Sequence, residues 1–200
     1  MEPLFVVAHP SELVGIPGEI VGVGLVDSAL GAARAIARFR AGRPPAVVLL
    51  GSCGAYEGSG LAIGSLVAAR TCTLACPGAA EGRAGWPGPV HRHVHSDDAW
   101  TDATGLRAVT VATTLSVTTD DALARALARD AVAQVENLEA FAVARACAEA
   151  NVPFTAILGV TNTVGARGRQ EWRAHAAEVA ARVCAAARAL RSPTTPRSPA

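Results

Sequence analysis

Residues 46–55 read Ala-Val-Val-Leu-Leu-Gly-Ser-Cys-Gly-Ala, and this stretch decides the fold. The apolar run 46–50 does not alternate with polar residues, which predicts a strand buried on both faces. Strands of this kind lie in sheets that carry helices on either side. Residues 51–55 are small, which would let the backbone approach a ligand and offer it exposed N–H groups. A tight turn between strand and loop explains the same residues equally well.

Strand and helix patterns alternate on both sides of this stretch. Besides 46–50, we predict strands at 4–8, 19–24, 61–69, 108–114 and 154–160, and helices at 27–39, 120–130, 139–150 and 171–190. Either Thr118 or Thr119 is expected to cap the helix at 120–130. Proline and glycine make 71–107 the least regular segment, with loops around one strand. The alternation predicts an α/β fold, a single three-layer α/β/α domain with a twisted mixed sheet.

Length and composition limit the classes of function. The 200 residues, half of them hydrophobic, suffice for one domain, which we expect over 1–190, with a disordered Pro/Ser tail over 191–200. The net charge is +1 and the basic residues are scattered along the chain, so no nucleic-acid partner is expected. The apolar runs are too short to span a membrane and the start lacks a signal peptide, which makes the cytoplasm the expected location.

Cysteine and histidine residues give no sign of a metal site. The five cysteines are an odd number without a CxxC pair, which argues against a disulfide framework or a structural zinc site. His91, His93 and His95 alternate and would share one face of a strand, but we interpret them as a polar exposed edge. We therefore expect neither a metal nor a cofactor.

Three polar residues stand near predicted strand ends. Glu12 follows the first strand, where a carboxylate could activate a water, although a solvated loop glutamate is the plainer explanation. Glu139 opens a helix face that should be buried, so it needs a partner, and the two hydroxyls of a ribose would suit it. Capping of that helix explains Glu139 as well. Asn162 ends an apolar strand and could simply begin a turn.

In combination, three motifs resemble the nucleoside phosphorylase and nucleosidase superfamily. They are Gly-Ser-Cys-Gly-Ala at 51–55, Glu-Asn-Leu-Glu-Ala-Phe-Ala at 136–142 and Thr-Asn at 161–162, in that order. The resemblance covers about 4–189 and is weakest between 71 and 107. Futalosine hydrolases are its most similar branch, supported by 136–139 and by 161–167 followed by Trp172.

The resemblance implies a role for each matching position. Glu12 would position or activate water, and Asn162 would read the base as the second catalytic residue. Glu139 would bind the ribose hydroxyls, with Leu138 packed beside the sugar. The remaining residues expected to line the substrate pocket are Ser52, Cys53, Gly54 and Asn137. Relatives assemble as dimers or larger oligomers, so the resemblance also implies a homo-oligomer.

The substrate and the nucleophile follow from two further positions. The Asn162 carboxamide offers a donor and an acceptor, which fits a 6-oxopurine, whereas adenine-specific relatives carry aspartate there. This favours hydrolysis of futalosine to hypoxanthine and dehypoxanthine futalosine, a step of menaquinone biosynthesis. Leu49 stands where bacterial phosphorylases carry a phosphate-binding arginine, so water is the expected nucleophile. The alternatives are a purine nucleoside phosphorylase, a methylthioadenosine/adenosylhomocysteine nucleosidase and a non-catalytic nucleoside-binding paralogue.

Two positions depart from the family pattern. Leu158 stands in the strand before Asn162, where nucleosidases often carry arginine. No aromatic residue lies at 115–117, where the family places the side chain that stacks on the base. These departures are the reason for keeping the non-catalytic alternative.

Overall fold

The apolar run 46–50 lies at the start of strand β3 (Val47–Ala55), as predicted. Successive side chains point to opposite faces of the sheet, so Val47 and Leu49 enter one core layer and Val48 and Leu50 the other. All four side chains are almost fully buried. The computed structural model describes residues 2–39, 42 and 44–193, so most of the predicted tail, 194–200, lies outside the described residues.

Within the described residues, β3 belongs to a mixed sheet of eight strands. The order is β2-β1-β3-β7-β6-β4-β5, and β8 pairs with both β3 and β4. The pairs β3–β7, β4–β8 and β4–β5 are antiparallel, and the others are parallel. The other strands are β1 (Leu4–Val7), β2 (Glu19–Ile20), β4 (Leu66–Leu74), β5 (His93–His95), β6 (Arg107–Thr113), β7 (Val135–Glu136) and β8 (Phe154–Thr163).

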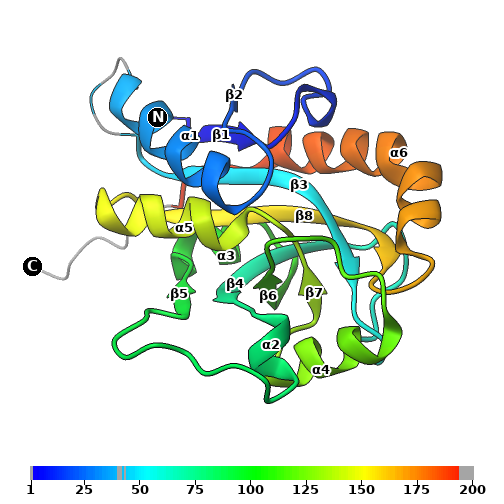
Figure 1. The fold of residues 1–200 in the computed structure, drawn as a ribbon. Coiled ribbons are helices and arrows are strands. Elements are labelled where there is room, and N and C mark those ends of the chain that lie inside the picture. The colour runs from blue at the N-terminus through cyan, green and yellow to red at the C-terminus, as the bar shows by residue number, and fades with distance from the viewer. Residues whose placement is uncertain (1, 40–41, 43, 194–200) are drawn as a thin grey trace, which may run out of the picture.

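Helices cover both faces of the sheet, which confirms the predicted three-layer α/β/α architecture (Figure 1). Helices α1 (Leu25–Arg38) and α5 (Ala140–Glu149) pack against each other on one face, and α6 (Gly168–Ala189) packs on the other. Helix α4 (Asp121–Ala131) closes a smaller cluster with Tyr56 and Ala112. The short elements are η1 (Pro10–Glu12), α2 (Pro77–Ala80) and α3 (Asp98–Ala103).

Several predicted boundaries were wrong. Residues 51–55 do not form a turn, because β8 pairs with β3 as far as Ala55, with a bulge between Cys53 and Gly54. The predicted strand 61–69 begins only at Leu66, since Gly64 has a φ of +87° and bends the chain before it. The second strand, predicted over 19–24, is limited to β2.

The cap of α4 also differs from the prediction. Neither Thr118 nor Thr119 caps it. Asp120 does, since its side chain accepts a hydrogen bond of 2.7 Å from the Leu123 N–H. An aspartate is as good a cap as threonine, and it stands directly before the first helical residue. The N–H and hydroxyl of Thr118 bind Glu136 instead.

Candidate active site

Glu12 is fixed by the short helical turn that follows β1. Its Oε2 accepts hydrogen bonds of 3.1 Å from the backbone N–H groups of Ala8 and His9. The His9 ring accepts the Ser11 N–H at 3.3 Å and completes a capping box. Helix α6 supports the turn, because the Cys184 thiol donates to the Glu12 carbonyl oxygen at 3.1 Å. The carboxylate is therefore held in one orientation.

The second oxygen of Glu12 faces strand β3. A Cβ atom added to Gly51 would lie 3.5 Å from Glu12 Oε1, so the carboxylate lies directly over that glycine. Partial burial raises the pKa of Glu12, while hydrogen bonds from the N–H groups of His9, Ser52 and Ala8 oppose the rise. A carboxyl group with a raised pKa is better suited to accept a proton from water.

Glu139 is buried at the start of α5, as the sequence predicts, and is 7% exposed. Two N–H donors hold its carboxylate: Gly24 donates to Oε1 at 2.9 Å and the Asn137 side chain donates to Oε2 at 3.1 Å. Burial raises the pKa of Glu139, and the nearby charge of Glu12 raises it further. A Cβ atom added to Gly51 would lie 3.5 Å from Glu12 Oε1 and 3.9 Å from the Asn137 Nδ2 that binds Glu139. The two carboxyl groups therefore face one site, although they lie 127 positions apart in the chain (139 − 12).

Asn137 links this pair of acids to the central strand. Its Nδ2 donates to the Ser52 carbonyl oxygen at 3.0 Å as well as to Glu139. Leu138 is partly exposed between these two buried residues. The structure thus brings Glu12, Ser52, Asn137 and Glu139 together from three separate parts of the chain.

The other small residues of β3 have different surroundings. The Ser52 hydroxyl accepts a hydrogen bond of 3.3 Å from the Trp172 indole, and both residues line one cavity. The Cys53 side chain packs in the core, where burial raises the pKa of its thiol, so only its backbone could contact a ligand. Gly54 leaves room for Asn162, since an added Cβ would lie 2.8 Å from Asn162 Nδ2.

Asn162 lies on β8 opposite Gly54. Its Oδ1 accepts a hydrogen bond of 2.8 Å from the Thr161 hydroxyl, and its Nδ2 donates to the Thr163 carbonyl oxygen at 3.0 Å. Among the described residues, no hydrogen bond engages the second N–H or the second lone pair of this carboxamide. Asn162 is therefore near Ser52 along the strand pair, with both a donor and an acceptor remaining.

A cavity of ≈ 280 Å³ lies beside Glu12 and Ser52, between β3 and α6. Trp172 is 47% exposed and lies at this cavity. The residues that line the cavity are Ser11, Glu12, Gly51, Ser52, Trp172, Arg173, Ala176, Ala177, Ala180 and Val183.

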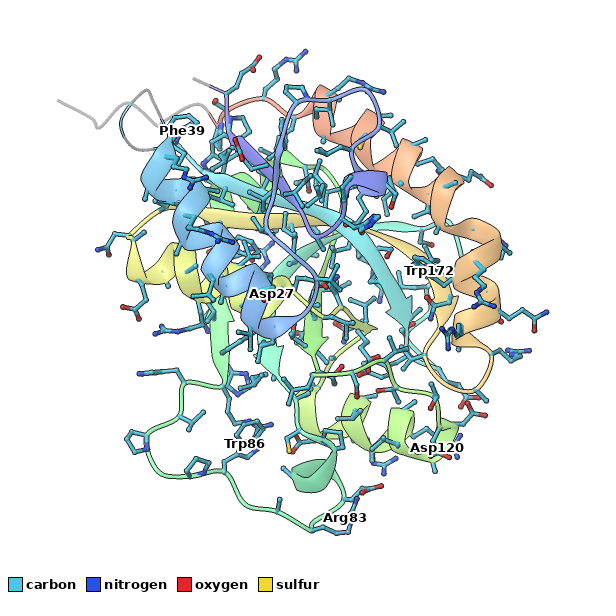
Figure 2. All side chains as sticks on the ribbon, turned by 45° about the horizontal axis from the view of Figure 1, so that its top comes forward. Asp27, Phe39, Arg83, Trp86, Asp120 and Trp172 are labelled. Carbon is cyan, nitrogen blue, oxygen red and sulfur yellow. The ribbon has the colours of Figure 1, made fainter. Side chains whose placement is uncertain are left out.

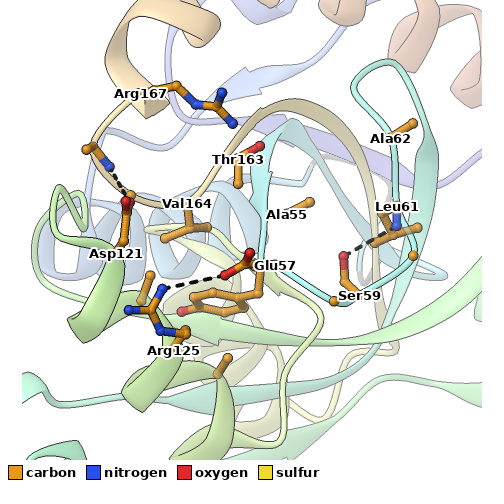
Figure 3. Close-up of a pocket in the computed structure, with 17 residues that line it drawn as sticks. Ala55, Glu57, Ser59, Leu61, Ala62, Asp121, Arg125, Thr163, Val164 and Arg167 are labelled. Atoms are coloured by element: carbon orange, nitrogen blue, oxygen red, sulfur yellow. Dashed lines mark hydrogen bonds and ion pairs between the residues drawn. The ribbon is translucent and has the colours of Figure 1, made fainter.

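A larger cavity of ≈ 650 Å³ lies between α4, the loop 57–62 and the turn 163–167 (Figure 3). None of the predicted site residues lines it. Its charged groups already have partners: Arg125 lies 3.5 Å from Glu57, Arg167 lies 3.5 Å from Glu171, and Asp121 accepts the Ala166 N–H at 2.9 Å. Size alone therefore does not mark the site. Glu12 and Ser52 line the smaller cavity and favour it, whereas Glu139 lines neither cavity.

Glu136 is a buried acid that the sequence analysis did not include among the site residues. Its carboxylate accepts three hydrogen bonds: from the Tyr56 hydroxyl at 3.1 Å, the Thr118 hydroxyl at 2.6 Å and the Thr118 N–H at 3.1 Å. Burial raises the pKa of Glu136. These bonds fix the end of the segment 114–118, where Leu115 and Val117 are exposed. Its place in the motif 136–142, directly before Asn137, was the available signal.

Two structural observations concern metals and membranes. Across 2–39, 42 and 44–193, no three His, Cys, Asp or Glu side chains are grouped so that they could hold a metal ion. His93 and His95 lie exposed on β5 and bind Thr73 and Thr71 instead. In the same described ranges, no helix combines the length and apolarity needed to cross a bilayer.

Comparison with known proteins gives the family and the fold. A model of the phosphorylase superfamily matches residues 3–191. No curated protein matches the chain. A futalosine hydrolase mutant from Helicobacter pylori has a similar structure, with a TM-score of 0.80, 14% identity, and 94% of this chain and 98% of that chain covered.

Two nucleosidase structures are similar to the same degree. The 5′-methylthioadenosine/S-adenosylhomocysteine nucleosidase of Streptococcus pneumoniae gives a TM-score of 0.79 at 18% identity, covering 94% of this chain and 97% of that one. The corresponding Helicobacter pylori enzyme gives 0.80 at 13% identity, covering 94% and 97%. Since the family model spans nearly the whole chain, this protein belongs to the phosphorylase superfamily.

Proposed function

We propose that this protein hydrolyses the N-glycosidic bond of a purine nucleoside. The observation that carries the proposal is the pair Glu12 and Glu139, two carboxyl groups held by backbone and amide donors near Gly51: a Cβ atom added there would lie 3.5 Å from Glu12 Oε1 and 3.9 Å from the Asn137 Nδ2 that binds Glu139. Breaking an N-glycosidic bond builds positive charge on the sugar and negative charge on the purine. Two fixed carboxylates stabilise the positive charge that develops on the sugar.

The two acids have different roles in this proposal. Glu12 acts as the general base, because its pKa is raised and it borders the cavity at Ser52. Glu139 accepts hydrogen bonds from the ribose hydroxyls through the lone pairs that Gly24 and Asn137 leave free. Leu138 packs beside the sugar.

Asn162 reads the base in this proposal. Its remaining N–H and lone pair fit a 6-oxopurine, which presents both an acceptor and a donor. The nucleoside lies against Ser52, Cys53 and Gly54 of β3, and Cys53 contributes only backbone atoms. We propose futalosine as the substrate, with hypoxanthine and dehypoxanthine futalosine as products of a step in menaquinone biosynthesis.

Water is the proposed nucleophile. Leu49 is 1% exposed in the core, so no guanidinium reaches a phosphate from that position. Phosphorolysis is the second candidate, and one observation favours it: Arg173 lines the cavity beside Glu12 and could pair with an anion there. The carboxylate of Glu12 opposes an anion at the same place, which is why hydrolysis is preferred.

A homo-oligomer is proposed as the working form. Val23, Val26 and Leu30 are 55–64% exposed around the start of α1, next to the Gly24 N–H that binds Glu139. Large exposed apolar side chains that lie together are typical of a surface that another chain covers. Light scattering coupled to gel filtration tests this, and a monomer at all concentrations would contradict it. The cytoplasm is the proposed location.

The decisive experiment is an assay of base release from futalosine, inosine and 5′-methylthioadenosine, each with and without phosphate. Release of hypoxanthine from futalosine without phosphate supports the proposal. Strict phosphate dependence would assign the chain to the phosphorylases, and preferential release of adenine would assign it to the nucleosidases for methylthioadenosine. Binding without turnover, unchanged by Glu12→Gln, would identify a non-catalytic nucleoside-binding protein.

A further inference from the structure

The Asn137 side chain uses its whole hydrogen-bonding capacity inside the protein. A carboxamide has two N–H donors and two acceptor lone pairs. The donors bind the Ser52 carbonyl oxygen at 3.0 Å and Glu139 Oε2 at 3.1 Å. The acceptor Oδ1 receives the N–H groups of Glu139 at 2.9 Å and Ala140 at 2.7 Å. No hydrogen-bonding valence remains for a substrate.

These four bonds converge on Glu139. The Asn137 oxygen satisfies the first free N–H groups of α5, which fixes the backbone from which Glu139 extends. Its amino group holds one carboxylate oxygen, while the Gly24 N–H holds the other. The bond to Ser52 ties this arrangement to β3.

The same bonds act on the charge of Glu139. Burial and the charge of Glu12 raise the pKa of Glu139, and the hydrogen bonds from Gly24 and Asn137 lower it. An N–H donor stabilises the ionised form, which is the form that can accept two hydroxyl groups. Loss of the Asn137 donor therefore both loosens the carboxylate and favours its protonation.

We propose that Asn137 is a positioning residue that orients and stabilises the Glu139 carboxylate, and that it does not itself contact the substrate. This inference rests on the proposed role of Glu139 in binding ribose. It replaces the expectation, drawn from the family resemblance, that Asn137 binds the substrate directly. Any hydrogen bond from Asn137 to a nucleoside would have to break one of its four bonds within a buried site.

Two variants and a matched control test the proposal. Asn137→Asp keeps an oxygen for the N–H groups of Glu139 and Ala140 but replaces the amino donor with a second oxygen. Asn137→Ala removes both. Asp120→Ala removes the equivalent cap of α4, away from the two acids, and controls for the loss of a helix cap alone.

The first measurement does not depend on activity. A ¹³C carboxyl titration of the full chain labelled at glutamate, with the Glu139 signal assigned through Glu139→Gln, reports the pKa of Glu139. Both Asn137 variants should raise that pKa, and Asp120→Ala should leave it unchanged while lowering Tm. An unchanged Glu139 pKa in both Asn137 variants would overturn the proposal.

The second measurement is a kinetic cycle on the nucleoside that the wild type hydrolyses. Asn137→Ala should lower kcat/KM by about tenfold or more. In the Glu139→Gln background the same change should have almost no further effect, because both residues act through one contact. Additive losses would overturn the inference. If the wild type releases no base, the proposed function fails, and the titration still decides whether Asn137 positions Glu139.

Discussion

Trp172 donates a hydrogen bond of 3.3 Å from its indole N–H to the hydroxyl of Ser52, which joins the last helix to the central strand at the edge of the cavity beside Glu12. The bond lies at the surface, so it adds little to stability. Its position makes Trp172 a reporter of the site. The other two tryptophans lie elsewhere: Trp100 is buried on α3, and Trp86 is well apart from Trp172 in Figure 2.

Binding of a nucleoside should therefore change the intrinsic fluorescence through Trp172. We expect Trp172→Phe to abolish the change in emission on titration with substrate or hypoxanthine, and Trp86→Phe to preserve it. Trp172→Phe should shift the free energy of unfolding by less than about 1 kcal/mol, because only an exposed hydrogen bond is lost. A ligand-induced signal that persists in Trp172→Phe would mean that the nucleoside binds elsewhere.

Glu12→Gln should abolish turnover, leave nucleoside binding nearly intact and stabilise the fold. The pKa of Glu12 in the folded state is raised above its ordinary value of 4.5, so the folded state favours the protonated carboxyl group. The wild-type protein therefore loses part of its stability as the pH rises from about 4.5 through the folded-state pKa. The amide does not ionise. Its Tm advantage should thus be small near pH 4 and larger at pH 8, by a few degrees, since about 1 kcal/mol corresponds to roughly 2–4 °C at this length. Calorimetry across this range measures it.

A Tm advantage that is constant or shrinks with increasing pH would contradict the burial of an ionised Glu12. Ser11→Ala serves as the control, because it alters the same turn without removing a carboxyl group. It should give the wild-type dependence of Tm on pH.

The sequence predicted the elements that depend on local pattern. Helices at 27–39 and 139–150 are confirmed as α1 and α5 within one or two residues, because their apolar residues recur at helical spacing. The extent of β3 could not be predicted in the same way. Whether Gly51 to Ala55 form a turn or a strand is decided by β8, which pairs with them from a distant part of the chain.

The sequence predicted the acids of the candidate site, but it could not predict which groups form hydrogen bonds with them. Burial of Glu139 followed from the apolar helix face that it begins. Its bond to the Gly24 N–H could not be inferred, because the two residues are 115 positions apart and glycine carries no side chain to signal a contact. Gly24 has a φ of +81°, a conformation that favours glycine and orients its N–H toward the carboxylate.

The buried triad of Glu136, Tyr56 and Thr118 should contribute to stability in a pH-dependent way. Tyr56→Phe removes one donor from the carboxylate and should cost about 1–2 kcal/mol of unfolding free energy, and Thr118→Val somewhat more. Both donors lower the pKa of Glu136 against the effect of burial, so their loss raises that pKa further. The cost should therefore be larger at pH 8 than at pH 4, as measured by urea unfolding.

Thr118→Ser is the matched control, because it keeps the hydroxyl that donates to Glu136. It should lose less than half of what Thr118→Val loses. Equal losses in the two variants, or a cost that does not vary with pH, would mean that packing rather than hydrogen bonding explains the effect.

Asn162→Asp should change the preference between purine bases. Asn162 Nδ2 donates to the Thr163 carbonyl oxygen, and its second N–H remains to bind an acceptor on the base. A carboxylate can only accept, so it repels both the Thr163 carbonyl and the 6-oxo group, while a 6-amino group would find a partner. An unpaired buried polar group costs about 1–3 kcal/mol, so the ratio of kcat/KM for inosine to that for adenosine should fall by roughly 10–100-fold. Asn162→Ala should lower both values without reversing the preference, and equal or faster turnover of futalosine by Asn162→Asp would refute the assignment of Asn162 to the base.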